Sequence, residues 1–458
     1  MKSPVIALLL AAAPLAAQAP AKAAAPAVRA LPAASATSTD SLGSIAAVRQ
    51  LPNGNLLVND QVRRRVVLMD STLKVIGVVA DSTSGTANAY GVRPGGLLAY
   101  RGDSTLFIDP ASLSMLVIDG AGKVVRVMAA PRPNDVQFLV GGAFGNPGFD
   151  AQGRIVYRSF ARPNFRRGAD GTPQSPEFPD SAALVRFDLA TRKLDTAAFF
   201  RIPKQNLIIS RGENGRVSVT NTINPLPITD DWAVLSDGTI AIVHGREYRV
   251  EFIGADGARS VADRIPFDWQ RLTDEDKVAF IDSTRAAMER RRVEFGRGGG
   301  AGADGAVVFG GGGGAGGGER QQVITMRMGG GGGGEPPRRG GNRGRNGSNT
   351  NGGNDSTAAN QLPPLNFVNP SDLPDYKPAF GVGSVRADMD DRLWVRTIPT
   401  RAAAGVTYDV IDRSGKLVDR IQVPANATIA GFGKGGIVYV GVRDGREIRL
   451  QRVKTNNN

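Results

Sequence analysis

Cysteine is absent from the 458 residues, and histidine occurs only once, at His244. The absence of cysteine excludes a disulfide scaffold, a thiol nucleophile, a cysteine-ligated zinc site and a lipid-modified N-terminal cysteine. A single histidine excludes a metal centre built from several histidines. Aromatic residues make up only 6% of the chain, yet 41% of it is hydrophobic, which is enough apolar material for a large core.

Long apolar runs are also missing after the first residues. The chain begins with Lys2 and an apolar stretch, Val5–Ala17, followed by a small residue at Ala19, which is typical of an export signal. No later run reaches the roughly 18 apolar residues that a membrane span needs. We therefore expect residues 1–23 to be a signal peptide and the mature protein to be periplasmic or secreted, with no transmembrane segment.

Glycine and arginine are concentrated in one segment. Of the 59 glycines, 26 lie in residues 296–360, and the rest of the chain has ordinary glycine content. Such a composition is typical of a disordered segment. The formal net charge is +13, and part of this excess also lies near the segment. The charge therefore marks no folded basic patch, and export argues against nucleic acid as a partner.

The most informative pattern is an internal repeat. Several β-formers end in Asp, a short turn follows, and a second β run begins, often after Lys or Arg. The copies end at Asp70, Asp119, Asp188 and Asp412, with a degenerate copy at Val250–Ile253. A polar turn and a short strand precede each copy, and the turns are Asn53-Gly54, Asp103-Ser104, Gln152-Gly153, Asp237-Gly238 and Asp390-Asp391. Because such pairs suit tight hairpins, each unit is predicted to hold four antiparallel strands.

Six such units predict an all-β fold, a six-bladed β-propeller. The sixth unit has its turn at Gly435-Gly436, and the chain ends one strand short. The segment Val28–Ala33 is similar to the end of the outer strand of unit five, Arg420–Ala425. We therefore expect an N-terminal strand, residues 26–33, to close the last blade.

The segment Val58–Asp70 resembles the NHL repeat, in which a strand ends in Asp and an Arg opens the next strand. Over residues 26–268 and 379–455 the chain resembles secreted bacterial six-bladed β-propellers of the NHL and TolB-like type. The resemblance implies the fold and no particular activity, because this architecture hosts unrelated functions.

The expected organisation has four parts. These are a signal peptide at 1–23, blades 1–4 at 24–268, an insertion at 269–378 and blades 5–6 at 379–458. The insertion opens with a predicted helix, Thr273–Phe295, whose apolar stripe should dock on the ring, and it continues as the glycine- and arginine-rich segment.

Propeller topology places the links from strand A to B and from C to D on one face, and the links from B to C and from D to A on the other. Both long insertions, Phe160–Ser181 and Asp268–Pro378, fall on this second, long-loop face. Long loops on a rigid scaffold commonly carry binding residues. The candidate binding residues are Asp60, Arg93, Arg132, Asp135, Asn146, Phe160, Arg162, Asn221, Asn224, Asp230, Asp231 and His244.

Several kinds of chemistry stay open on this face. Carboxylate and amide oxygens, Asp109 included, suit a divalent ion of the kind that gluconolactonase-like propellers hold over the axis. No spacing fixes them as ligands, and solvated loop residues are the simpler interpretation. Arginines and aromatics, among them Phe165, Arg166 and Arg167, suit anionic or sugar-like ligands and protein partners. His244 has no nucleophile motif beside it and is more simply a loop histidine.

The sequence therefore predicts an exported, non-enzymatic binding or interaction propeller. No cofactor is implied, and the expected partner is a protein, a glycan or an anionic small molecule. The alternative is a metal-dependent hydrolase or lactonase with a site above the central channel. Three or more oxygens converging on the axis would favour the hydrolase, whereas arginines and aromatics at the mouth would favour binding.

Overall fold

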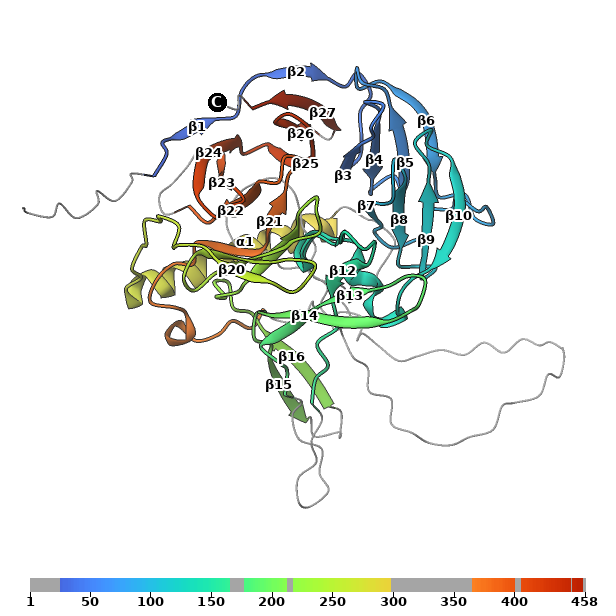
Figure 1. Cartoon of the computed structure of the whole chain (residues 1–458). Helices are drawn as coiled ribbons and strands as arrows, with labels where there is room; N and C mark the ends of the chain where they lie inside the picture. Colours follow the sequence, from blue (N-terminus) through green and yellow to red (C-terminus); the bar gives the residue numbers. More distant parts are fainter. Residues whose placement is uncertain are drawn as a thin grey trace, which may run out of the picture.

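The computed structural model describes residues 25–164, 177–211, 217–297, 365–399, 405–445 and 447–455. For residues 206–211, 217–221, 291 and 293–297 only the backbone is described. The predicted signal peptide lies outside these ranges. The described chain forms a ring of six antiparallel sheets (Figure 1), which confirms the predicted six-bladed β-propeller.

The first four blades follow one another along the chain. In each, the first strand lies nearest the axis, because the first strands of successive blades contact one another. Blade 1 holds β3 (Ile45–Gln50), β4 (Leu56–Asp60), β5 (Arg65–Met69) and β6 (Val75–Ala80). Blade 2 holds β7 (Gly96–Ala99), β8 (Thr105–Asp109), β9 (Ser114–Ile118) and β10 (Val124–Ala129). Blade 3 holds β11 (Gly148–Phe149), β12 (Ile155–Arg158), β13 (Ser181–Phe187) and β14 (Leu194–Arg201). Blade 4 holds β17 (Asp231–Val234), β18 (Ile240–His244), β19 (Arg249–Ile253) and β20 (Arg259–Val261).

The last two blades each use an N-terminal strand. Blade 5 holds β21 (Phe380–Ala387), β22 (Leu393–Thr397), β23 (Gly405–Ile411) and β24 (Leu417–Pro424), and β1 (Val28–Ala30) adds to its outer edge. Blade 6 holds β25 (Ala427–Gly433), β26 (Ile437–Asp444), β27 (Glu447–Lys454) and β2 (Ala34–Thr37). The N-terminus therefore closes the ring, as predicted.

The position of the closing strand differs from the expectation of residues 26–33. β2 pairs antiparallel with β27, whereas β1 pairs in parallel with β24, so that Val28 faces Arg420. Pro32 lies between the two short strands and has no N–H to donate to a ladder, which ends the pairing on blade 5. The chain then moves on to blade 6. Residues 28–33 and 420–425 are similar in sequence, but they do not occupy the same strand position in two different blades. Residues 28–30 instead pair with residues 420–422 as neighbouring strands of blade 5.

The repeated Asp at the end of a β run shapes the tight turns. In blade 1, Asp70 Oδ1 accepts hydrogen bonds from the N–H groups of Thr72 (2.9 Å) and Lys74 (3.1 Å). Asp119 and Asp412 accept the same pair of bonds, two and four residues later. The residue before each Lys has a positive φ, which glycine meets without strain at Gly122 and Gly415. This geometry explains why the repeat carries Asp and why glycine often precedes the Lys.

Each junction between neighbouring blades holds its own apolar cluster. Six such clusters of buried residues run around the ring, one per junction of the described chain. Successive side chains of a strand point to opposite sides of its blade, so each blade contributes to two clusters. Trp232 and Trp394 are fully buried in two of them.

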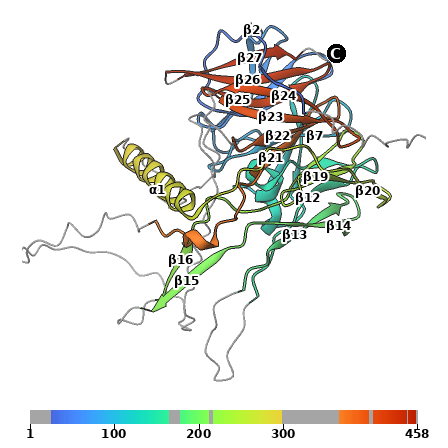
Figure 2. The same cartoon turned by 90° about the vertical axis from the view of Figure 1, so that its left-hand side faces the viewer.

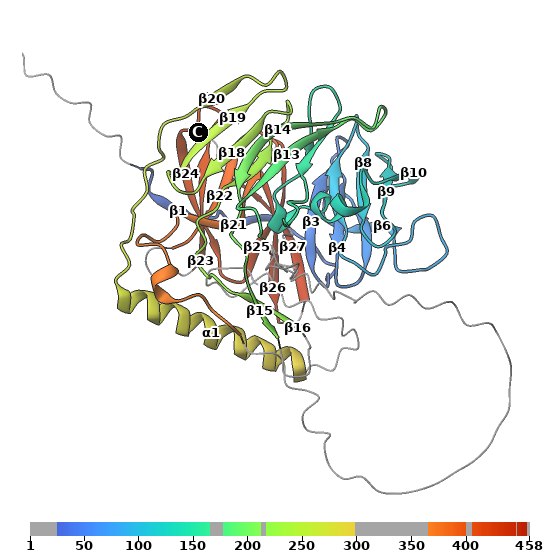
Figure 3. The same ribbon diagram turned by 90° about the horizontal axis from the view of Figure 1, so that it is seen from below.

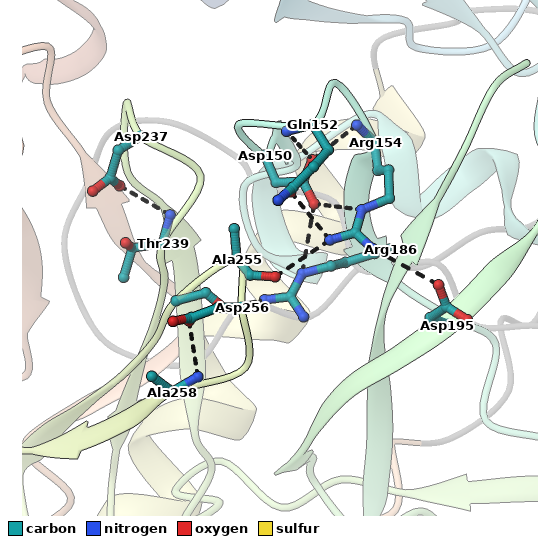
Figure 4. A network of polar contacts seen from close by, with 11 residues as sticks. Asp150, Gln152, Arg154, Arg186, Asp195, Asp237, Thr239, Ala255, Asp256 and Ala258 are labelled. Atoms are coloured by element: carbon teal, nitrogen blue, oxygen red, sulfur yellow. Dashed lines mark hydrogen bonds and ion pairs between the residues drawn. The ribbon is translucent and has the colours of Figure 1, made fainter.

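On the tight-turn face, a polar network fastens blade 3 to blade 4 (Figure 4). Arg154 donates from Nε to Asp150 Oδ2 (2.7 Å) and from Nη2 to the carbonyl of Ala255 (3.5 Å). Arg186 is buried and donates to the carbonyl of Gly254 (2.7 Å), and burial lowers its pKa. The network links strands within blade 3 to the outer turn of blade 4, so we assign it a structural role.

The insertion between blades 4 and 5 contains α1 (Asp274–Arg297), close to the predicted Thr273–Phe295. Thr273 caps the helix: its Oγ1 accepts from Asp276 N–H (3.2 Å), and Asp276 Oδ2 accepts from Thr273 N–H (3.0 Å). Figures 2 and 3 show α1 beside the ring, at the same side as the hairpin of β15 (Asn206–Arg211) and β16 (Val217–Thr222). Within the described residues, no helix has the length and apolar character needed to span a bilayer.

Candidate functional site

Three insertions leave the ring on the long-loop face, and the sequence analysis had identified two of them. Residues 159–180 link β12 to β13, and α1 lies in the link between blades 4 and 5. The third is the hairpin β15–β16, in the link from blade 3 to blade 4. Two of the three insertions therefore arise from blade 3, which directs attention to the rim of blades 3 and 4.

Parts of these insertions interlock into a cap, which we define as residues 223–226, 271–285 and 365–376. Its apolar centre consists of Leu226, Leu272, Ile281, Val368 and Leu373. Short backbone pairings join the segments: Ile223 pairs with Phe367, and Arg271 pairs with Tyr376. α1 therefore docks on the cap, mainly through its first turns, rather than directly on the ring as expected.

A second feature, which we call the plug, links blades 2 and 3 and reaches the inner strand of blade 5. It is the link 130–147, with the short helices η1 (Pro133–Leu139) and η2 (Gly142–Phe144). Although it leads into blade 3, η2 contacts β21 of blade 5, two blades further round the ring. Gly383 has φ +70°, and a Cβ there would come within 2.8 Å of Ala143 Cα. Glycine is thus required for this close approach.

A shallow hollow of about 190 Å³ opens at the outer rim, which we call the blade 3–4 hollow. Its lining residues are Asp180, Ser181, Phe199, Phe200, Arg201 and Asp230. Phe199 is 68% exposed, which is unusual for an aromatic side chain in the described chain. An aromatic ring within a polar and charged rim is a combination typical of binding surfaces.

Arg158, at the end of β12, lies between the plug and the hollow. Its Cζ lies 5.2 Å from the ring centroid of Phe138, 5.4 Å from that of Phe144 and 5.9 Å from that of Phe200. Burial lowers the pKa of Arg158 to about 10, although the charge of Asp231 opposes the shift. Its Nε is buried and has no hydrogen-bond partner among the described residues.

His244 lies beside the hollow, with a carboxylate on each ring nitrogen. Nδ1 lies 3.3 Å from Asp230 Oδ2, and Nε2 lies 3.0 Å from Glu251 Oε2. The hydrogen bond with Asp230 raises the pKa of His244, against the effect of burial. A protonated ring that donates from both nitrogens cannot act as a general base or bind a metal. His244 therefore joins β18, β19 and the link before β17, and its two carboxylate neighbours favour the protonated ring.

The predicted carboxylates are occupied by the protein's own donors. Asp60 is fully buried and accepts from the N–H groups of Gly43 and Ser44 and from Arg65 Nε. Asp109 accepts from the N–H of Ala111 (3.0 Å).

Asp135 is also buried. It accepts from Arg132 Nε (2.6 Å), Tyr157 Oη (3.3 Å) and the N–H of Phe160 (3.1 Å). These carboxylates fasten loops and lie on different blades. Among the described residues, no group of three or more His, Cys, Asp or Glu side chains is arranged to hold a metal ion.

Two of the predicted residues join the inner strands instead. Asn146 Nδ2 donates to the carbonyl of Val385 (2.5 Å), and Asp231 Oδ2 accepts from the N–H of the same residue (2.9 Å). Asp231 Oδ1 also accepts from the N–H of Trp232 (2.9 Å). Both side chains therefore fix the plug and blade 4 to blade 5.

The remaining predicted residues do not gather into one site. Phe160 stacks on Phe138 with centroids 6.3 Å apart, which places it beside Arg158. Asn224 Oδ1 accepts from the N–H of Leu226 and forms a turn. Arg93 and Arg162 are exposed on loops. Asn221 lies on β16, where only the backbone is described, and Phe165, Arg166 and Arg167 lie outside the described residues.

Sequence reasoning missed Phe199 and Phe200, which line the hollow, and Arg158, whose guanidinium lies over the ring of Phe200. The available signal was weak: Arg158 follows the apolar run Ile155–Tyr157, and the residues at the corresponding positions of other blades are Asn59, Asp109, Val243 and Arg396. A charge in line with buried Val156 points to the same side of the strand, towards blade 4.

Comparisons with known proteins found propellers among solved structures. No family model matches the chain, and no curated protein matches it. A gluconolactonase from Xanthomonas campestris shares 12% identity, with 95% of this chain and 99% of that chain covered and a TM-score of 0.35. Regucalcin, a calcium-binding protein from Agrobacterium tumefaciens, shares 11%, with 92% and 96% covered and a TM-score of 0.30. A virginiamycin B lyase from Staphylococcus aureus shares 13%, with 50% and 73% covered and a TM-score of 0.26.

Proposed function

We propose that this chain is an exported, non-catalytic binding protein that holds its ligand on the long-loop face at the rim of blades 3 and 4. The observation that carries the proposal is the blade 3–4 hollow, where exposed Phe199 stands beside Arg201 and Asp180. Both insertions of blade 3 leave the ring next to it. A rigid ring that carries an aromatic residue and charges between long loops suits recognition of a ligand.

Binding accounts for the chemistry of the face better than catalysis does. His244 donates to two carboxylates, and Asp230 also accepts from the N–H groups of Arg201 (3.0 Å) and Gly245 (3.1 Å). A general base needs a free lone pair, and a metal ligand needs a free oxygen or nitrogen. The hydrolase alternative places its site at the axis, where the plug contacts β21, the inner strand of blade 5.

The ligand classes that fit are a protein segment, a glycan or an anionic small molecule. Aromatic surface stacks on sugar rings and on apolar side chains, and Arg binds carboxylates and other anions. Export rests on the first 23 residues, and N-terminal sequencing of the protein from a periplasmic or culture fraction tests it. A retained Lys2 in the recovered protein would contradict export.

The test of binding uses thermal unfolding of the whole protein with three sets of probes: short acidic peptides, neutral oligosaccharides and small carboxylates. We expect one set to raise the unfolding temperature of the wild type and to lose this effect in Phe199→Ser. Val261→Ser is the matched control, because Val261 is also an exposed apolar residue, on β20. The control should keep the full effect.

Two outcomes would contradict the proposal. The first is a stabilising effect that both variants lose or both keep, since it would place binding elsewhere or make it unspecific. The second is calcium-dependent turnover of a lactone by the wild type, which would establish the hydrolase alternative.

A further inference from the structure

The outer edge of blade 3 is open over one short stretch. β14 is the last strand of its sheet, and no strand of the described chain pairs with its outer side. Blade 4 and the link that leads into it already engage this edge at two places. The carbonyl of Ala197 accepts from Arg259 Nη2 (3.2 Å), and the N–H of Arg201 donates to Asp230 Oδ2 (3.0 Å). The stretch between these two places is about 13 Å long, at roughly 3.3 Å per residue.

The pairing register leaves the backbone of Phe199 free within this stretch. The N–H of Ile202 donates to the carbonyl of Asp180 (2.8 Å), so Ile202 bonds towards β13. Bonding direction alternates along an antiparallel pair, so the N–H and C=O of Phe199 point away from β13. No described residue hydrogen-bonds to these two groups. A backbone donor and a backbone acceptor therefore face outward beside an aromatic side chain that lines the hollow and is 68% exposed.

Blade 5 shows what an outer edge of this ring can bind. Its strand β24 is covered by β1, which adds to it in parallel. The N–H of Leu31, just after β1, donates to the carbonyl of Gln422 (2.9 Å). Arg29 on β1 forms an ion pair with Asp419 on β24. The molecule thus already holds an extended segment on one outer edge, through backbone pairing and one ion pair.

Arg201 provides a charge for a comparable ion pair at the edge of β14. Phe199 and Arg201 are two residues apart on the strand, so their side chains lie on the same side of it. Arg201 is half-buried, lines the hollow and forms no ion pair with a described residue. A guanidinium in this position suits a carboxylate. Asp180 also lines the hollow and adds a negative charge, so a single acidic group fits better than a cluster of them.

We propose that the edge of β14 binds an extended peptide by strand addition. The peptide exchanges two hydrogen bonds with the N–H and C=O of Phe199, packs an apolar side chain on the Phe199 ring and places one acidic side chain on Arg201. The inference rests on the proposed function, because it uses the same hollow, and it names the ligand class as a protein segment. Since the open stretch is short, a segment of about five residues covers it, whereas pairing of whole edge strands between two copies needs a longer open edge.

The experiment measures binding of the peptide acetyl-Thr-Val-Thr-Asp-Thr-amide to the whole protein by isothermal titration calorimetry. Its Val and Asp are two residues apart, as Phe199 and Arg201 are. Five analogues each carry one N-methyl group on a different residue. We expect one of them to bind at least roughly threefold more weakly, because it loses the hydrogen bond to the C=O of Phe199. The analogues methylated at the neighbouring residues should bind almost as the parent does, because successive N–H groups of a strand point to opposite sides.

A pair of variants separates the backbone of Phe199 from its ring. Phe199→Ala removes the ring and keeps the N–H, whereas Phe199→Pro removes both. Proline is tolerated at edge positions whose N–H points outward, so both variants should fold, and the N-methyl series on the wild type decides the matter if Phe199→Pro does not. Phe199→Pro should bind the peptide at least roughly threefold more weakly than Phe199→Ala does.

Val261 on β20 provides the matched control pair, Val261→Ala and Val261→Pro. Val261 is 54% exposed, and the N–H of Ala262 donates to the carbonyl of Val250, so the N–H of Val261 also points outward from its blade. Both control variants should bind the peptide as the wild type does.

Three results would overturn the inference. These are equal binding of the parent peptide and all five analogues by the wild type, equal binding by Phe199→Ala and Phe199→Pro, and a dimer in sedimentation equilibrium that Phe199→Pro dissociates, which would assign the edge to a second copy. If oligosaccharides or small carboxylates stabilise the protein in a manner that depends on Phe199 while the peptide does not bind, strand addition is wrong and the proposed function stands. If no probe depends on Phe199, both fail.

Discussion

Removal of the His244 imidazole should destabilise the protein and abolish a defined part of its pH dependence. The ring donates to Asp230 in the link before β17 and to Glu251 on β19. Glu251 is held in addition by Arg259 Nη1 (2.9 Å), and Arg249 is the strand partner of His244 on β19. The imidazole therefore joins β18 and β19 to the segment just before β17, where the link from blade 3 to blade 4 ends.

The size of the effect follows from these contacts. Each hydrogen bond to a charged group contributes about 1.5–3 kcal/mol. The His244 side chain is 25% exposed, so solvent screening reduces both contributions. Asp230 and Glu251 each keep other donors after the ring is removed, which limits the cost of leaving them behind. For His244→Gln we expect a loss of about 2–3 kcal/mol at pH 6.

The sign of the pH dependence is fixed by the direction of the pKa shift. The hydrogen bond with Asp230 raises the pKa of His244 in the folded state above the value of about 6.5 in the unfolded chain. The stabilisation is therefore fully present below pH 6.5 and is lost as the pH rises through the raised pKa. The wild type should lose stability as the pH rises above about 6.5 and through the raised pKa of His244, and His244→Gln should not.

Urea unfolding at half-unit pH steps, followed by tryptophan fluorescence, measures both quantities. The chain has one histidine and no cysteine, so a slope in this range belongs to one side chain, apart from the N-terminal amine that both proteins share. The ring is also the single histidine signal in a proton NMR titration. Equal stability of the two proteins at pH 6, or parallel pH profiles, would refute this account of His244.

Three further outcomes can be checked. A variant that begins at Thr37 lacks β1 and most of β2. It should melt at a lower temperature than a variant that begins at Ala25, because blade 6 loses its outer strand. Equal melting temperatures would contradict the role of β2 in closing the ring. Gly383→Ala should lower the free energy of unfolding by about 1–3 kcal/mol, because φ is positive there and Ala143 occupies the space of the Cβ. Gly381→Ala, which has open space around it, should be near neutral in the same urea assay. Replacing residues 298–360, which lie outside the described chain, with a short Gly-Ser linker should leave the melting temperature almost unchanged, because loop-closure cost grows by only about 0.6 kcal/mol per doubling of length; a clear loss of stability would show that this segment contributes to the fold.

The ring could be predicted from the sequence because its turns are local. An Asp that accepts hydrogen bonds from residues two and four positions later leaves a visible trace in three copies, at Asp70, Asp119 and Asp412. Alternating apolar residues then mark the strands between the turns. The edge pairing of the N-terminal strands was harder to predict. β1 and β2 are short, and short strands of this kind could pair with the outer edge of blade 5 or of blade 6.

The candidate site was less accessible to sequence reasoning. Asp60 and Asp135 were predicted to bind a ligand because they lie on loops, but each accepts hydrogen bonds from donors brought close by folding. Arg158 was overlooked because it belongs to a strand, and only packing places rings from two other segments around it. The composition of a loop shows which groups are present and not which of them remain available.

The closing strands also determine the order in which the protein can be completed. β2 precedes every blade in the chain, but its partner β27 ends at Lys454, and the hydrogen bond from Leu450 N–H to Ser38 Oγ joins residues 412 positions apart. A ribosome supplies the N-terminal half of this pairing first and the C-terminal half last. Blades 1 to 4 can assemble from neighbouring segments as they emerge, whereas the ring stays open until synthesis is almost finished. We therefore expect chains truncated within blade 6 to remain open rings that expose the edge strands of blades 1 and 5 and to be early substrates of proteases.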